Sequence, residues 1–379
     1  MLPGPRSSGR LKTAEELRGA VAEVVAHAQI TRIADVTRLD RIGLPCWQAI
    51  RPMGRSLSVH QGKALTDEGA RLGAVLEAWE AHCGEHYDAP VLTCGFEALS
   101  PSVRAPAIGD FAKDDAIAID PSRQIDWVVA PDWRGREVAV PFACISMDFT
   151  RMLGTPIDRS SNGVAVGSSR DEAIASAMLE LIERDAVTEW KSTSMIDRIG
   201  DQIDLDRAGL EWLDFWRERL QSVGASLRCY TLPSLTGTPV IAAELGDSGK
   251  SAAPFRAIHG HSAHPDPEVA LFRAIAETIQ GRAAYIAGSR DDLPPSQYAL
   301  RQDALRVAFA MPLPVGMDGK SFDAISHGPA SVNEMVDRIA AAGLGPVVVI
   351  DLGQVGPFHA VRVIACGLAA RRRRRRVAA

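Results

Sequence analysis

The stretch from Ser160 to Lys191 constrains the fold most, because a glycine-punctuated loop runs directly into a long helix that carries acidic residues. Glu180 and Glu183 are three residues apart, so they are neighbours on the helix surface. Glu172 lies roughly 20° from Glu183 around the helix axis, at about 100° per residue. Like charges placed this closely repel one another unless a cation or water screens them. Two interpretations of this acidic helix remain open: its acids form a solvated surface, or they form one wall of a cation site.

Two further segments, 66–86 and 266–290, read as amphipathic helices. On both of them, charged side chains recur three or four positions apart, a spacing that places them on one face. These side chains are Glu77 and Glu80 on the first helix, and Arg273 and Glu277 on the second. The chain therefore supplies a second and a third set of charges to combine with the first.

Paired carboxylates on separate helices, with basic residues nearby, suit a magnesium-bridged nucleoside triphosphate. Magnesium prefers carboxylate and phosphate oxygens and keeps several waters. Lys63 and Arg184 supply cations that can clamp phosphate oxygens while charge shifts. No Walker A sequence is present, but the loops 61–63 and 162–169 precede helices and can offer backbone N–H groups to phosphates.

Other chemistries have weaker support in the sequence. His259, His261 and His264 have a spacing that can bind zinc, but no fourth ligand is evident nearby, and we favour a loop packed on the third helix. No GxSxG elbow is present. The six cysteines contain no CxxC pair, which argues against a zinc ribbon or a redox pair. Cys83, beside two carboxylates, stays open as an alternative nucleophile.

Composition indicates a soluble globular protein, with 46% hydrophobic and 23% charged residues among 379. No apolar run approaches the ~18 residues that a membrane-spanning helix needs. The basic N-terminus is followed by no apolar segment, so we expect no secretory signal and a cytoplasmic location. The net charge is −5 although residues 371–376 are all arginine, so the rest of the chain is acidic and we expect no specific nucleic-acid partner.

The remaining elements are predicted from periodicity and turn residues. We expect a helix over 12–29, two strands within 30–51, a short strand over 56–63 that ends in a Gly-Lys loop, and a strand over 140–149. A helix-strand-strand order over 207–245 recurs over 332–365, which suggests an internal repeat. Residues 286–330 read as a long loop region with one short helix over 297–309.

Four segments together resemble the YcaO family. The helix-bearing stretch NGVAVGSSRDEAIASAMLELIERDA resembles the family's Asn-Gly…Gly…Glu-Ala…Glu-x-x-Glu-Arg-Asp segment. The stretch TRIADVTRLDRIGLPCWQAIRP resembles the family's N-terminal strand pair. The stretch GKALTDEGARLGAVLEAWEA resembles its Gly-Lys-Gly loop and first Glu-x-x-Glu helix. The stretch GHSAHPDPEVALFRAIAETIQGR resembles its Arg-Ala-x-x-Glu-x-x-Gln-x-Arg helix. They follow the family's order across roughly residues 30–365, nearly the whole chain.

The resemblance implies an α+β, YcaO-type fold of mixed sheets with flanking helices and a nucleotide site between helices. It also implies ATP and Mg²⁺ as cofactors. We expect a catalytic domain over 30–368, an N-terminal helical extension over 1–29 and an arginine-rich tail over 369–379. The residues that would hold magnesium are Glu77, Glu80, Glu180, Glu183 and Glu277, and those that would contact the nucleotide are Lys63, Ser168, Glu172, Arg184 and Arg273.

The implied activity is ATP-dependent modification of peptide backbone amides. A Cys, Ser or Thr side chain as nucleophile gives an azoline, and external sulfide gives a thioamide. The chain looks closest to the stand-alone, TfuA-associated branch, because it shows no fused E1-like domain and no proline-rich tail. We therefore favour a thioamide, with a peptide or protein substrate and a TfuA-like partner, and leave a homodimer open.

Some positions depart from the family's pattern. Gly73 stands where Ser is usual, Ala64 replaces the second Gly of Gly-Lys-Gly, Ala81 stands where Arg is common, and Ser168 where Asn is frequent. The chain end lacks the family's Pro-Gly-Leu-Glu. These departures weaken nucleotide contacts without removing a metal carboxylate. Two alternatives stay open: a different Mg-ATP ligase that joins a carboxylate to an amine, and a non-catalytic peptide-binding or accessory protein.

Overall fold

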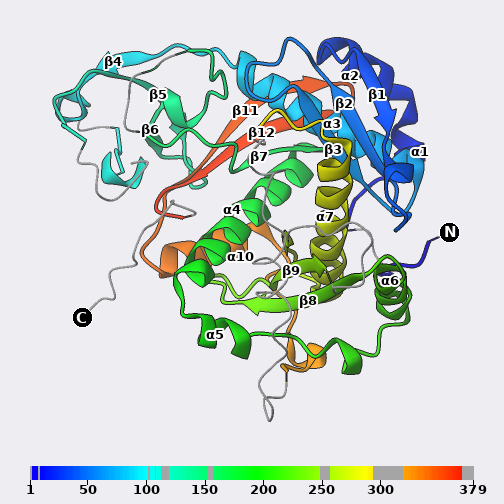
Figure 1. Ribbon diagram of the computed structural model, residues 1–379. Helices are drawn as coiled ribbons and strands as arrows, with labels where there is room; N and C mark the ends of the chain where they lie inside the picture. The colour runs from blue at the N-terminus through cyan, green and yellow to red at the C-terminus, as the bar shows by residue number, and fades with distance from the viewer. Residues whose placement is uncertain are drawn as a thin grey trace.

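The computed structural model describes residues 2–6, 9–100, 103–106, 108–111, 119–151, 153, 157–247, 257–292 and 319–368. They form an α+β fold with four three-stranded antiparallel sheets. Three of these sheets each carry a long helix, and the fourth forms a lobe at the left of Figure 1. None of the described helices is long and apolar enough to cross a membrane.

The first unit is the sheet β1-β2-β3 with helix α3 packed on β2 and β3. Two short N-terminal helices, α1 and α2, pack on α3, where Val24 meets the fully buried Trp79 in one apolar core. The bounds are α1 Ala14–Leu17, α2 Val21–His27, β1 Arg32–Asp35, β2 Cys46–Ile50, β3 Val59–Lys63 and α3 Asp67–His86. The predicted helix over 12–29 therefore forms, with a 3-10 turn at Arg18–Ala20.

The second unit is the sheet β11-β12-β7, with helix α4 packed on β12 and β7. Helix α10 adds to the apolar core on the α4 side of this sheet. The bounds are β7 Val164–Gly167, α4 Arg170–Ser192, α10 Val332–Ala341, β11 Val347–Val355 and β12 Phe358–Ala365. Strands from the middle and the end of the chain therefore share one sheet.

The third unit is the sheet β10-β9-β8, with helix α7 packed on β10 and β9 and helix α6 on β8. Helix α5 lies between the second and third units in the chain. The bounds are α5 Met195–Gly200, α6 Glu211–Ser222, β8 Ala225–Leu232, β9 Val240–Asp247, β10 Ile258–Ala263 and α7 Pro267–Ala287. The predicted helix-strand-strand repeat is present, and a third strand completes each of its sheets.

In all three units a strand runs directly into the long helix: β3 into α3, β7 into α4 and β10 into α7. Thr66, Ser169 and Asp266 cap these helices by accepting hydrogen bonds from backbone N–H groups of the first turn. Glycine allows strand and helix to approach closely, because a Cβ at Gly62 would lie 2.1 Å from the Ala70 carbonyl oxygen, and one at Gly260 would lie 2.3 Å from that of Ala274.

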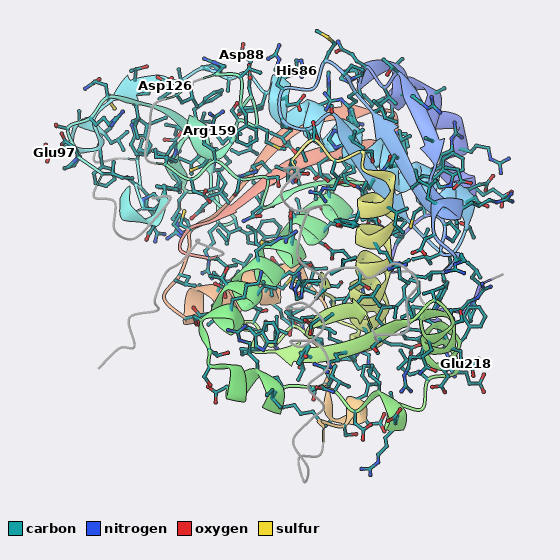
Figure 2. The ribbon with its side chains drawn as sticks, in the orientation of Figure 1. His86, Asp88, Glu97, Asp126, Arg159 and Glu218 are labelled. Atoms are coloured by element: carbon teal, nitrogen blue, oxygen red, sulfur yellow. The ribbon has the colours of Figure 1, made fainter. Side chains whose placement is uncertain are left out.

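The lobe is the sheet β4-β5-β6, which touches the second unit through a bridge between Asp132 and Val348. Glu97 and Asp126 are labelled in this lobe, far from α7 (Figure 2). The bounds are β4 Leu92–Cys94, β5 Ile125–Pro131 and β6 Glu137–Pro141. The short 3-10 helices of the chain are Arg18–Ala20, Thr37–Leu39, Phe96–Ala98, Ile108–Phe111, Phe142–Cys144, Leu205–Arg207 and Phe322–Ala324.

Three local predictions were wrong, and two more fall outside the described residues. The strand expected over 140–149 ends at Pro141, because the next three residues form a 3-10 turn that buries Phe142 in the lobe core. The Gly-Lys loop is instead the end of β3, where Gly62 and Lys63 pair with β2. The histidine segment is strand β10 rather than a loop. The predicted helix 297–309 and the arginine run 371–376 lie outside the described residues.

Candidate nucleotide and magnesium site

The site begins with one carboxylate from each strand-helix unit, oriented by a backbone N–H group of its own unit. Gln61 N donates to Glu77 Oε2 at 3.1 Å, and His261 N donates to Glu277 Oε2 at 2.9 Å. Gly163 N donates to Glu180 Oε2 at 3.0 Å. Each bond engages one carboxylate oxygen and fixes its side chain, so the three units present acids in a defined orientation.

The predicted carboxylates lie close enough together to perturb one another. Burial raises the pKa of Glu77 to about 7 and that of Glu183 to about 8, and Glu277 adds to both shifts. Burial also raises the pKa of Glu80 well above its usual value, with further contributions from Glu180 and Glu77. Acids from α3, α4 and α7 therefore share one electrostatic environment, which favours a site over a solvated surface.

Arg184 lies among these acids and balances only part of their charge. Its Nη2 is 3.6 Å from Glu180 Oε1, and its Nε is 3.6 Å from Glu183 Oε1. Both distances exceed a hydrogen bond, and Nε has no hydrogen-bond partner in the described part of the chain. A guanidinium held in this way leaves room for another cation or for phosphate oxygens.

The donor set fits magnesium. All five predicted ligands are carboxylates, which a hard divalent cation prefers, and the buried acids repel one another without such an ion. Within the described ranges, no three His, Cys, Asp or Glu side chains are grouped tightly enough to enclose a metal by themselves.

The predicted nucleotide contacts other than Arg184 lie near the points where strands lead into the same helices. Glu172 accepts from Ser168 Oγ at 2.6 Å and Ser168 N at 2.7 Å. Burial opposes ionisation of Glu172, but these bonds outweigh it and lower its pKa. Burial and the neighbouring Arg10 lower the pKa of Arg273 to about 10. Lys63 Nζ donates to Gln280 Oε1 at 2.8 Å, which links β3 to α7.

Sequence reasoning missed Arg10. Its Nη1 lies 3.7 Å from Glu172 Oε1, and Leu11 N donates to the same oxygen at 3.4 Å. Gly9 O accepts from Arg273 Nη2 at 3.3 Å, so the segment 9–11 links α4 and α7 at the edge of the site. No periodic or spacing signal marks this segment, because it precedes the first helix and reaches the site only through tertiary structure.

The family model that describes a YcaO cyclodehydratase, binding ATP and Mg²⁺, matches residues 61–369. The chain belongs to the YcaO family. A curated relative, the uncharacterized protein in the tfuA 3′ region of Rhizobium leguminosarum bv. trifolii, is 31% identical over 357 residues, which are 89% of this chain and 83% of the relative. The predicted family and both predicted cofactors are confirmed, and the relative supports the TfuA-associated branch.

Solved structures confirm the predicted YcaO fold. The YcaO from Methanopyrus kandleri bound with AMPPCP and Mg²⁺ gives a TM-score of 0.70 at 22% identity, covering 94% of this chain and 92% of that chain. A heterocyclase in complex with substrate and cofactor gives 0.76 at 19% identity over 95% of this chain. This chain spans only 52% of that heterocyclase, about half its length.

The two alternative centres in this YcaO chain are not supported. His264 Nδ1 accepts from Asp266 N at 3.0 Å, so this histidine helps to shape the entry of α7, and the described residues contain no metal-binding group that includes it. Burial raises the pKa of the Cys83 thiol to about 12, and Glu80 adds to the shift. Cys83 is therefore held as an unreactive thiol rather than a nucleophile.

Magnesium binding is expected to depend on pH through the buried acids. A raised pKa means that the folded protein holds protons that the unfolded chain releases, so the metal-free protein should lose stability as pH rises toward about 8. Magnesium replaces those protons and should raise the melting temperature more at about pH 8 than at about pH 6.5. Thermal unfolding with and without Mg²⁺ measures both effects.

The matched comparison for this experiment is Glu183→Gln. This variant removes one of the raised pKa values, so its melting temperature should fall less between the two pH values than that of the unaltered protein. Histidines and cysteines contribute equally to the pH dependence of the melting temperature in both proteins, so their contribution cancels in the comparison. Equal pH slopes for the two proteins would contradict the assigned proton uptake.

Proposed function

We propose that this YcaO protein activates a peptide backbone amide by phosphorylating its oxygen, and that sulfide then gives a thioamide. The observation that carries the proposal is the cluster of glutamates from α3, α4 and α7, which raise one another's pKa and whose charge Arg184 balances only in part. Such a cluster is suited to a magnesium-bridged triphosphate.

The residue roles follow from position and chemistry. The five glutamates would hold Mg²⁺, which would neutralise part of the negative charge of the triphosphate. Lys63, Arg184 and Arg273 would contact phosphate oxygens and stabilise charge as it shifts between them. Ser168 and Glu172, joined by two hydrogen bonds, would contact the rest of the nucleotide at the start of α4.

The substrate and partner are proposed from the family and its branch. A relative encoded in a tfuA 3′ region supports a TfuA-like partner, and the family's chemistry supports a peptide or protein substrate in the cytoplasm. We infer a catalytic domain over 30–368. Residues 9–11 of the preceding extension contact Glu172 and Arg273, so we expect the extension to be needed for full nucleotide affinity.

The test uses purified protein with Mg-ATP, sulfide, a TfuA-like protein and a candidate substrate peptide. We expect the peptide to exchange one oxygen for one sulfur, with ATP consumed in step with thioamide formation. A peptide with an oxygen-labelled amide should transfer its label to inorganic phosphate. Loss of one water from the peptide would instead show an azoline and correct the nucleophile.

Two other outcomes separate the alternatives. Calorimetry that detects no magnesium-dependent nucleotide binding would leave an accessory, peptide-binding role, to which the departures at Ala64, Gly73 and Ala81 point. Phosphate release that depends on an added amine and a carboxylate, rather than on a peptide amide, would indicate a carboxylate-amine ligase.

A further inference from the structure

A cavity of about 70 Å³ lies between the lobe and the second unit, where β12 meets the loop that leads into β7. Asp158 and Asn162 come from that loop, and Leu181 comes from α4. Cys144 and Cys366 also line it. Arg159, labelled in Figure 2, belongs to the same loop. The volume corresponds to two or three waters, at about 30 Å³ each.

The main polar group of this cavity is Arg362 on β12. Its side chain is 4% exposed, and its Nη1 donates to the Ser160 carbonyl oxygen at 2.9 Å. Its Nε has no hydrogen-bond partner among the residues that the structure describes. A buried donor without an acceptor is destabilising, and an arginine cannot lose its charge to avoid this. The structure thus keeps a positive, incompletely bonded group beside a cavity.

The cavity adjoins the glutamate cluster. Asn162 immediately precedes Gly163, the backbone donor to Glu180, and Leu181 immediately follows Glu180. Arg362 interacts electrostatically with Glu180 and Glu80. A molecule bound at Arg362 is therefore within electrostatic range of two of the carboxylates that would hold magnesium.

The lining selects the kind of ligand. The guanidinium favours an anion, and Asp158 and Asp110 repel a doubly charged anion such as phosphate about twice as strongly as a singly charged one. The two thiols and the carbon atoms of Phe111 and Leu181 suit a weakly hydrated, polarizable ion rather than a strongly hydrated one. Burial raises the pKa of Cys144, so this thiol adds no further negative charge.

We propose that this cavity binds the hydrosulfide ion, with Arg362 as its anion-binding residue. The inference rests on the proposed thioamidation and identifies the site where the sulfide nucleophile binds before it reacts. The sulfur lone pair forms the C–S bond as the carbonyl electrons move to oxygen. That oxygen receives the phosphoryl group of ATP and leaves as phosphate, which takes the proton from sulfur. The product is a C=S amide, and no oxidant or reductant is needed.

The direct test is bromide binding, because bromide is a weakly hydrated monovalent anion that scatters anomalously. Crystals of the full chain soaked in bromide should show an anomalous peak within hydrogen-bond distance of Arg362 Nε. Crystals of Cys144→Leu, in which two added methyl groups fill the cavity, should lack that peak. No peak in the unaltered protein, or a peak that survives Cys144→Leu, would overturn the proposal. A peak that sulfide at assay concentration does not displace would be an adventitious ion only.

The kinetic test measures KM for sulfide and KM for ATP separately in the full assay. Arg362→Lys keeps the charge but loses Nε, so KM for sulfide should rise by about tenfold or more, as expected for one lost charged hydrogen bond. KM for ATP should change little in this variant. Cys144→Leu should also raise KM for sulfide. If Arg362→Lys does not fold, the Cys144→Leu result decides whether the cavity binds sulfide.

The control is Arg159→Lys. Arg159 also has an unpartnered Nε and donates to the carbonyl oxygens of Arg151 and Asp148, so it stabilises the same loop without lining the cavity. It should leave KM for sulfide unchanged, and an equal rise in this variant would show a purely structural effect. If the unaltered protein makes no thioamide, the proposed function fails, whereas the bromide experiment still decides whether the cavity binds a soft anion.

Discussion

Glu183→Gln and Glu80→Gln are each expected to lower magnesium-dependent ATP turnover by at least about 100-fold, since loss of an outer-shell partner of a metal site alone costs roughly 10–100-fold. Both side chains belong to the buried cluster, and each keeps a raised pKa through burial and neighbouring acids. A glutamine has the same shape but only one acceptor oxygen and no charge, so it weakens magnesium binding directly.

The same substitutions should leave folding intact. Removing one charge from a set of repelling acids should leave the melting temperature of the metal-free protein equal or higher. The matched control is Asp171→Asn, which alters an exposed acid on the first turn of α4 and should retain turnover. If either glutamine variant hydrolyses ATP at the normal rate, the magnesium assignment is wrong. If either variant unfolds, the carboxylate has a structural role instead.

Glu85→Ala is expected to lower the free energy of unfolding by about 3–5 kcal/mol, the usual effect of removing one partner of a buried ion pair. Glu85 Oε2 lies 2.7 Å from Arg51 Nη2, and both side chains are almost fully buried. Arg51 Nε also donates to the Ala28 carbonyl oxygen at 2.8 Å, and Ser56 N donates to Glu85 Oε1 at 2.9 Å. The pair therefore joins α2, β2 and α3, and the substitution leaves a buried guanidinium without its counter-ion.

Urea unfolding measures this loss. The control is Glu68→Ala on the same helix, which removes an exposed ion pair with Arg18 and should change stability by less than about 1 kcal/mol. Replacing both buried partners together, Arg51→Met with Glu85→Leu, should recover much of the stability, because the unpaired charge is gone. A loss below about 1 kcal/mol for Glu85→Ala would contradict the predicted role of the pair.

The sequence predicted the long helices and their acids because these depend on local periodicity. A spacing of three residues places Glu77 beside Glu80 and Glu180 beside Glu183 in any helix, so these candidate metal ligands could be identified before the fold. The start of α7 was equally predictable, since Asp266 suits an N-cap and Pro267 suits the first helical position. The role of Gly62 was predicted less well. The sequence suggests a loop residue, whereas in the structure this glycine allows a strand and a helix to pack closely.

The rest of the site depends on contacts between distant parts of the chain. Arg10 reaches Glu172 across 162 positions, and Arg362 meets the loop before β7 only because β12 pairs with β7. Glu85 looks like one more acid of α3, yet it faces Arg51 rather than the glutamate cluster. A single sequence contains no signal for such pairings, because they result from how the sheets assemble.

The three strand-helix units also determine how the site could fail. Each unit contributes ligands that are useful only beside those of the other two, so the cluster exists only while all three units are docked. Bound magnesium and nucleotide should therefore stabilise the docking of the three units against one another. In hydrogen exchange, amides of α3, α4 and α7 should become protected together when the nucleotide binds, whereas the lobe β4-β5-β6, which contributes no ligand, should exchange as before.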